Sequence, residues 1–237
     1  MLEAVLFDGG DTLVGWAWDE RLLEAGHDAG LRALGREPRP ELTARFRAAY
    51  LPLLQGREEL DEVDYPALMR QLLGELGIEP SGEQLDRFLA AEHEAWAPAR
   101  RVADGVLELL DELRARGLRL GLVSNSFDPG WLVRGDLEAW GLAERLDTVV
   151  LSSEVGRRKP HPEPFERALR ELGVAPGRAL FVGDSRNHDV KGAAEAGMAT
   201  VQALWFRADD DPRGREPDHV ATAPSAVLEI VTTVATT

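Results

Sequence analysis

The chain has 237 residues, of which 44% are hydrophobic and 29% are charged, and these proportions are ordinary for a globular protein. Its formal net charge of −15 makes it a poor partner for nucleic acid or for an anionic membrane surface, so we expect neither. The chain contains no cysteine, which excludes disulfides, zinc thiolates and a cysteine nucleophile.

The sequence carries no signal for membrane insertion or export. No apolar run approaches the roughly 18 residues that a membrane span needs. The first ten residues, MLEAVLFDGG, contain neither a basic stretch nor a small-residue cleavage site, so we expect no secretory signal. These features predict a cytoplasmic protein, either a monomer or a homodimer.

Most of the chain alternates between strand and helix patterns. Short apolar runs that stop at polar or turn-forming residues predict strands at 5–7, 118–125, 148–153, 179–185 and 200–206. Apolar residues at helical spacing predict helices between them, at 106–116, 162–173 and 189–197. This alternation predicts an α/β fold, with a Rossmann-like parallel sheet and helices on both faces. The polar segment 207–219 is expected to be a loop.

Residues 15–98 carry helical patterns alone. No strand pattern interrupts this stretch, and its helical patterns cover 19–35, 40–56, 65–77 and 82–96. Because the stretch separates the first strand from the rest of the α/β pattern, we expect an all-helical domain inserted over the sheet. The predicted division is a core of 1–14 and 99–237, with a cap of 15–98.

Polar side chains stand at the carboxyl ends of the predicted strands, where parallel sheets bind their ligands. They are Asp8, Ser124, Asn125, Lys159, Asp184 and Asp189. Clustered carboxylates repel one another unless a cation lies among them, and a few oxygen ligands with room for water suit Mg²⁺. A nearby lysine and hydroxyl would hold a tetrahedral dianion, which indicates phosphoryl transfer. With no cysteine and no serine–histidine pair, the candidate nucleophile is an aspartate that forms an acyl-phosphate.

Lys159 is notable for a second reason. The chain has 27 basic residues, and only Lys159 and Lys191 are lysines. A lysine in a chain that otherwise uses arginine indicates a place where a compact, flexible ammonium is needed. Lys191 is interpreted as an exposed surface residue.

These residues, in this order, resemble the haloacid dehalogenase (HAD) superfamily. FDGGDTL resembles its first motif, VSN the second, RKPHPEPF the third and GDSRNHDVKGA the fourth. The inserted helices resemble the cap of the subfamilies with a helical cap of type one. The resemblance covers nearly the whole chain and implies a hydrolase of that superfamily, a phosphatase acting on a small phosphate ester.

The resemblance implies a role for each residue of the phosphate site. Asp8 is the nucleophile, Ser124 hydrogen-bonds the phosphoryl oxygens with Asn125 beside it, and Lys159 neutralises charge and orients Asp8. Gly9 and Gly10 let the backbone come close to the metal and the phosphate.

The implied metal is Mg²⁺. Asp8 and Asp184 would be ligands, and the backbone carbonyl of Gly10 would be a third. Asp189 would support the metal directly or through water, or it would only cap the helix that follows.

Gly10 departs from the family pattern D-x-D-G-T, because it stands where the second aspartate is usual. That aspartate protonates the leaving group and then activates water, and a positioned acid–base is worth about 10²–10⁴ in rate. Three interpretations follow: a weak phosphatase in which Asp11 or water supplies protons, a metal-independent 2-haloacid dehalogenase, or a non-catalytic binding protein. Dehalogenases usually lack an acid at the place of Asp184, and Asp11 also fits a local turn.

The cap is expected to select the substrate. Trp16 and Trp18 either wall the pocket or pack in a hinge. Arg157 and Arg158 either attract anions or lie in a solvated loop.

Overall fold

The central sheet has six strands in the order β5-β4-β1-β6-β7-β8, and every neighbouring pair is parallel. The computed structural model describes residues 1–54, 60–206 and 214–236. The sheet strands are β1 Ala4–Phe7, β4 Arg119–Ser124, β5 Thr148–Leu151, β6 Ala179–Gly183, β7 Ala199–Ala203 and β8 His219–Ala221. Within the described ranges, no helix is long and apolar enough to cross a membrane.

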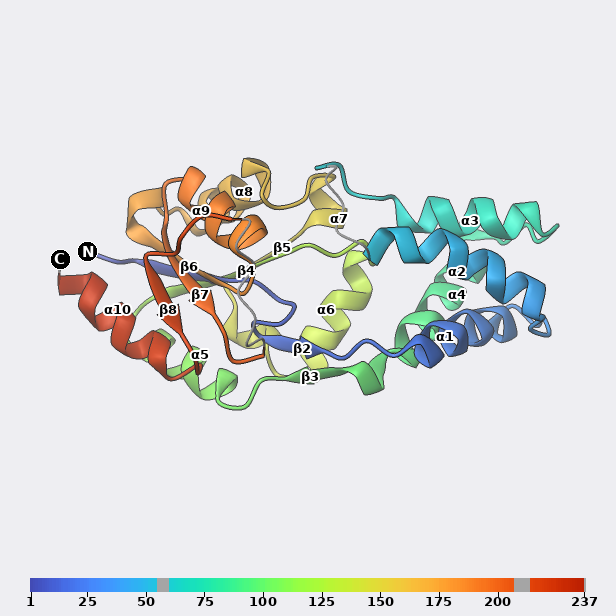
Figure 1. Cartoon of the computed structure of the whole chain (residues 1–237), viewed down its shortest axis with the longest axis horizontal. Coiled ribbons are helices and arrows are strands. Elements are labelled where there is room, and N and C mark those ends of the chain that lie inside the picture. Colours follow the sequence, from blue (N-terminus) through green and yellow to red (C-terminus); the bar gives the residue numbers. More distant parts are fainter. Residues whose placement is uncertain (55–59, 207–213, 237) are drawn as a thin grey trace.

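Helices cover both faces of the sheet, as the sequence predicts. They are α5 Val106–Ala115, α6 Gly130–Ala139, α7 Ser152–Val155, α8 Pro162–Leu172, α9 Lys191–Glu195 and α10 Ala226–Thr236. Figure 1 shows α5 and α10 on one face, and α8 and α9 on the other. Successive side chains of a strand point to opposite faces, so β1 contributes side chains to two apolar cores. Val5 and Phe7 pack in the first core, while Ala4 and Leu6 pack in the second.

The segment between β1 and the remaining sheet strands is helical. It contains α1 Glu20–Ala33, α2 Pro40–Leu54, α3 Tyr65–Glu75 and α4 Gly82–Ala95, which share a separate apolar core. Figure 1 shows these helices at the end of the molecule away from the chain termini. We call them the cap. An antiparallel pair, β2 Val14–Trp16 with β3 Arg100–Val102, joins the cap to the sheet domain.

Several elements differ from the sequence predictions. The helix predicted at 189–197 is a π-helical turn, Arg186–Val190, followed by α9. The predicted loop 207–219 ends in β8, and its residues 207–213 lie outside the described residues, as do 55 and 56 of the second cap helix. Helix α6 was not predicted, because Gly130 and Gly135 weaken its helical signal.

The parallel topology decides where the site lies. Strands β4, β1 and β6 are direct neighbours, so their carboxyl ends meet at one edge of the sheet. That edge faces the cap (Figure 1).

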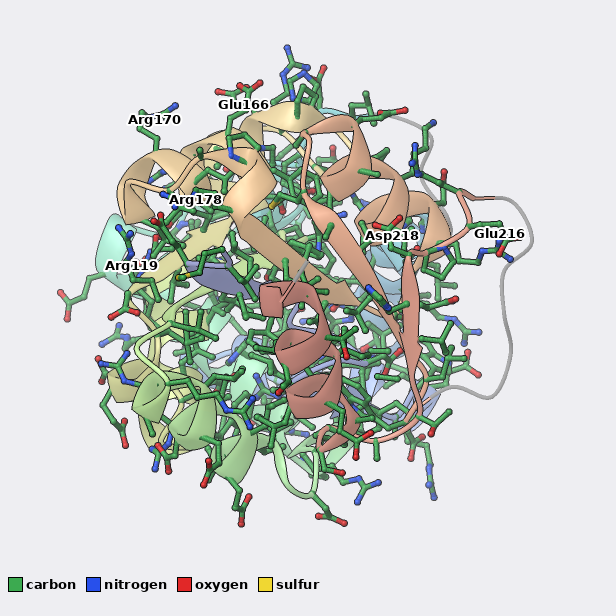
Figure 2. All side chains as sticks on the ribbon, turned by 90° about the vertical axis from the view of Figure 1, so that its left-hand side faces the viewer. Arg119, Glu166, Arg170, Arg178, Glu216 and Asp218 are labelled. Atoms are coloured by element: carbon green, nitrogen blue, oxygen red, sulfur yellow. The ribbon has the colours of Figure 1, made fainter. Side chains whose placement is uncertain are left out.

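The opposite end of the core carries charges that are engaged with one another (Figure 2). Arg178 pairs with Glu3 at 2.5 Å, and Glu216 pairs with Arg186. Asp218 accepts hydrogen bonds from the amide and the hydroxyl of Thr200. These ion pairs and hydrogen bonds stabilise the end of the core that lies away from the cap.

Candidate active site

Asp8 and Lys159 form a buried ion pair at this edge. Asp8 directly follows β1, and its Oδ1 accepts a hydrogen bond from Lys159 Nζ at 2.5 Å. The two residues are only 7% and 3% exposed. Residues 151 positions apart in sequence thus meet as predicted, although Lys159 lies in the loop between α7 and α8 and not at the end of a strand.

Asp189 lies on the other side of the same ammonium. Its Oδ1 accepts from Lys159 Nζ at 2.6 Å, and its Oδ2 accepts from the Ser185 amide at 2.9 Å. A Cβ on Gly183 would lie 2.5 Å from the Asp189 side chain, so the glycine allows this close packing. Ser185, not Asp189, makes the capping bond to the following turn, because its side chain accepts from the His188 amide.

Asp184 completes a group of three carboxylates. Asp8, Asp184 and Asp189 each offer an oxygen, and these oxygens all lie within 4.8 Å of one another. The group comes from the ends of β1 and β6 and from the π-helical turn that follows β6. The sequence prediction placed these acids near each other, and the structure brings them together.

The electrostatics of the group favour an additional cation. Burial raises the pKa of Asp8 to about 7; Lys159 opposes this rise and Asp189 adds to it. Burial alone would lower the pKa of Lys159, but the charges of Asp189 and Asp8 outweigh it and raise that pKa. Three carboxylates meet at this edge, and two of them share the ammonium of Lys159. An all-oxygen group of this kind fits Mg²⁺.

Ser124 and Gly9 form the adjacent wall. A Cβ on Gly9 would lie 2.8 Å from the Ser124 Oγ, so the absence of a side chain lets the β1 and β4 ends come close. Ser124, Gly9, Gly10 and Asn125 all line one cavity between this edge and the cap.

Asn125 holds the backbone of Lys159. Its Nδ2 donates to the Lys159 carbonyl at 3.1 Å, and its Oδ1 accepts from the Lys159 amide at 2.8 Å. Both polar atoms of the side chain therefore position the lysine, a role that the motif comparison did not assign.

Gly10 and Asp11 differ sharply in environment. A Cβ on Gly10 would meet no atom within 4 Å, so this position has open space. Asp11 has a φ of 53°, and its carboxylate accepts from the Trp16 amide at 3.2 Å. Asp11 lines a different hollow, together with Gly15 and Phe206. These contacts favour a local turn role for Asp11 over a role as the proton donor in place of the missing second aspartate.

The residues that the sequence offered as contacts to substrate from the cap side differ in their positions. Trp16 lines the cavity and stacks on Trp96 with ring centroids 5.1 Å apart, while Trp18 also packs on Trp96, with ring centroids 5.4 Å apart. Arg157 pairs with Asp61 of the loop before α3, and Arg158 lies 3.7 Å from Glu62. Acids thus neutralise both arginines.

The sequence analysis missed four charged residues that line the same cavity. They are His93, Arg100, Asp128 and Asp136, and we call them the ionic cluster. His93 Nδ1 lies 3.2 Å from Asp128, and its Nε2 lies 2.8 Å from Asp136. Arg100 also pairs with Asp136. Since they come from α4, β3, the β4–α6 loop and α6, no spacing in the sequence marks them.

The ionic cluster links the cap to the core, and this predicts a dependence of stability on pH. Burial alone would lower the pKa of His93, but hydrogen bonds to Asp128 and Asp136 raise it from 6.5 to about 9, with Arg100 opposing. A raised pKa stabilises the folded protein fully below 6.5, and this stabilisation is lost as pH rises through about 9.

The measurement compares the thermal midpoints of the wild type and His93→Gln from below pH 6.5 to above pH 9. The wild type should be more stable at the acidic end, and the difference should shrink toward the basic end. A difference that stays constant with pH would contradict a charged His93.

The sheet and the carboxylates at its edge define an α/β enzyme of the hydrolase class. More narrowly, the chain belongs to the haloacid dehalogenase-like hydrolase family, because the profile of that family matches residues 2–197. It is 30% identical over 236 residues to a glyceraldehyde 3-phosphate phosphatase of Methanopyrus kandleri, with 98% of this chain and 97% of that protein covered.

Solved structures agree on the fold. A HAD phosphatase from Thermococcus onnurineus is 25% identical, with a TM-score of 0.66 over 97% of this chain and 98% of that one. A 2-haloacid dehalogenase from Pseudomonas syringae pv. Tomato is also 25% identical, with a TM-score of 0.67 over 98% and 99%. The fold is therefore common to both reaction classes, and the site has to separate them.

Proposed function

We propose that the chain is a Mg²⁺-dependent phosphatase that hydrolyses a small phosphate monoester through an aspartyl-phosphate on Asp8. The observation that carries this proposal is the meeting of three carboxylates at one edge of the sheet, two of which share the ammonium of Lys159. Such a group is costly to bury unless a divalent cation is bound, and a dehalogenase that attacks carbon has no use for one.

In the proposed reaction, a carboxylate oxygen of Asp8 attacks phosphorus and the leaving-group oxygen departs. Lys159 holds Oδ1 of Asp8 at 2.5 Å, which orients the carboxylate and leaves Oδ2 for the attack. The Ser124 hydroxyl would donate to a phosphoryl oxygen. Water then cleaves the acyl-phosphate at phosphorus, which releases phosphate and restores Asp8.

Asp8, Asp184 and the Gly10 carbonyl would hold the metal, which supplies positive charge against the phosphoryl oxygens. Asp189 acts differently in this proposal. Since its two oxygens already accept from Lys159 and from Ser185, it positions the lysine and the β6 end. Its contribution to the metal is then indirect.

The missing acid at Gly10 limits which esters react well. With Asp11 bonded to the turn, the proton for the leaving group comes from water. Esters with good leaving groups need little protonation and should react best.

The dehalogenase is the second candidate, since a structural neighbour has that title and Gly10 lacks the second aspartate. The third candidate is a non-catalytic binding protein. A metal and substrate panel separates the three.

We expect p-nitrophenyl phosphate to be hydrolysed in Mg²⁺ and not in excess EDTA, with activity restored when Mg²⁺ is added back. The reason is that the buried carboxylates cannot accept a phosphate dianion without further positive charge. Release of p-nitrophenol, followed by absorbance, is the measurement.

Two other outcomes would overturn the proposal. Halide release from 2-chloropropionate in EDTA, without phosphatase activity, would favour the dehalogenase. Mg²⁺ binding without turnover of any ester on a broad panel would favour a binding protein.

A further inference from the structure

The ionic cluster closes one part of the cavity that contains the phosphate edge. This cavity has a volume of about 290 Å³ and includes Gly9, Gly10 and Ser124. Its remaining wall is largely apolar and includes Trp16, Tyr50, Phe127, Val133, Leu137 and Trp140. A phosphate ester seated at Ser124 therefore has its leaving group between aromatic side chains and the cluster.

The basic side chains in this wall are already neutralised. Among the described residues that line the cavity, the bases are His93 and Arg100, and both contact Asp136. Asp128 pairs with the other imidazole nitrogen of His93. With the histidine protonated, the cluster carries two positive and two negative charges.

The pairing is well protected from water. The side chains of His93 and Arg100 are 10% and 6% exposed, so neither can turn out to meet a new partner without leaving its carboxylate. Arg100 is held further, because its Nη2 donates to the His93 carbonyl at 3.0 Å. Among the described residues of this wall, a leaving group with its own carboxylate would therefore find no unpaired cation.

We propose that the ionic cluster and the aromatic wall make this pocket selective for phosphate monoesters whose leaving group is uncharged and has an apolar face. Leaving groups that carry a second anion are disfavoured, because the cations among the described residues of this wall are already paired with Asp128 or Asp136. This inference rests on the proposed phosphatase function and names the class of its substrate.

The test uses two esters that differ in one charge: para-carboxyphenyl phosphate and its methyl ester. The two are similar in size and leaving-group chemistry, so the ratio of their kcat/KM values reports on charge recognition. We expect the wild type to prefer the methyl ester by about tenfold or more, since the carboxylate would lose hydration against the largely apolar wall and gain no ion pair from its described residues.

Asp128→Asn and Asp136→Asn should each lower this preference, by about tenfold for a charge removed close to the leaving group. The change should come from a lower KM for the carboxylate ester. Asp128 is 30% exposed and contacts His93 alone within the cluster, so its variant keeps the Arg100–Asp136 pair if Asp136→Asn disturbs folding.

A matched control removes the same charge elsewhere. Asp111 is exposed on α5 and pairs with Arg145, so Asp111→Asn should leave the preference unchanged. A wild type that uses both esters equally would overturn the inference. A preference that survives both Asp128→Asn and Asp136→Asn would overturn it as well.

Failure of the proposed function is distinguishable from failure of this inference. If neither ester is hydrolysed in Mg²⁺, the phosphatase proposal is wrong. Calorimetric affinities of the two esters then test the selectivity directly, and equal affinities would refute it.

Discussion

The Asp8→Asn variant is expected to lose phosphate-ester hydrolysis by at least about 10³-fold while keeping its fold. Asparagine has nearly the same shape but is a far weaker nucleophile than a carboxylate. It also removes a charge whose burial is unfavourable, since burial raises the pKa of Asp8 to about 7. The thermal midpoint without Mg²⁺ should therefore not fall. The measurement is kcat for p-nitrophenyl phosphate, together with thermal unfolding.

Asp11→Asn is the matched control for this change. Asparagine tolerates the φ of 53° at this position and can accept the same hydrogen bond from the Trp16 amide. Its turnover should stay within about threefold of the wild type, as is usual for a surface change that keeps its contacts. Full activity in Asp8→Asn would contradict the proposal that Asp8 is the nucleophile. A large loss of activity in Asp11→Asn would support Asp11 as the proton donor in place of the missing second aspartate.

Gly10→Asp is expected to raise kcat/KM for an alkyl ester such as glycerol phosphate by about 10²-fold, the lower end of the range for a positioned acid–base. The position has room, because a Cβ there would meet no atom within 4 Å. An alkoxide leaving group needs a proton and p-nitrophenolate needs little, so kcat/KM for p-nitrophenyl phosphate should change much less.

Gly10→Asn tests whether a gain in Gly10→Asp comes from the acidic proton or only from the added side-chain atoms. It adds the same atoms at the same place but no acid, so it should not raise kcat/KM for glycerol phosphate. Equal gains from Gly10→Asp and Gly10→Asn would mean that packing is responsible. No gain from Gly10→Asp would mean that the missing acid is not the limiting defect.

Much of the fold could be predicted because its signals are local. Short apolar runs mark most of the sheet, and helices such as α8 end at a glycine with positive φ, Gly173 at 64°. The meeting of Asp8 with Asp184 also followed, since parallel strands bring their carboxyl ends to one edge. Topology turned sequence positions far apart into one site.

The elements that sequence analysis missed depend on partners far away in the chain. Strand β2 exists through its pairing with β3, where Val14 lies opposite Val102. Strand β8 has three residues, which are too few for a periodic pattern, and it depends on its pairing with β7. No pattern at either place could indicate the pairing.

The same reason explains which site residues were missed. The ionic cluster exists only because the C-terminal part of α4 packs beside α6, where His93 reaches Asp136. The role of Asn125 was also hidden, since both of its contacts are to the backbone of a loop 34 positions away. Motifs identify residue types, whereas these roles come from packing.

Rapid acid quenching followed by peptide mass spectrometry would detect the phosphoryl group that Asp8 is proposed to carry during turnover. Because Gly10 supplies no base to activate water, the acyl-phosphate formed from p-nitrophenyl phosphate in Mg²⁺ should accumulate in the wild type and decline in Gly10→Asp. We expect one phosphoryl group on the peptide that contains Asp8. Steady release of p-nitrophenol with that peptide unmodified throughout would contradict it.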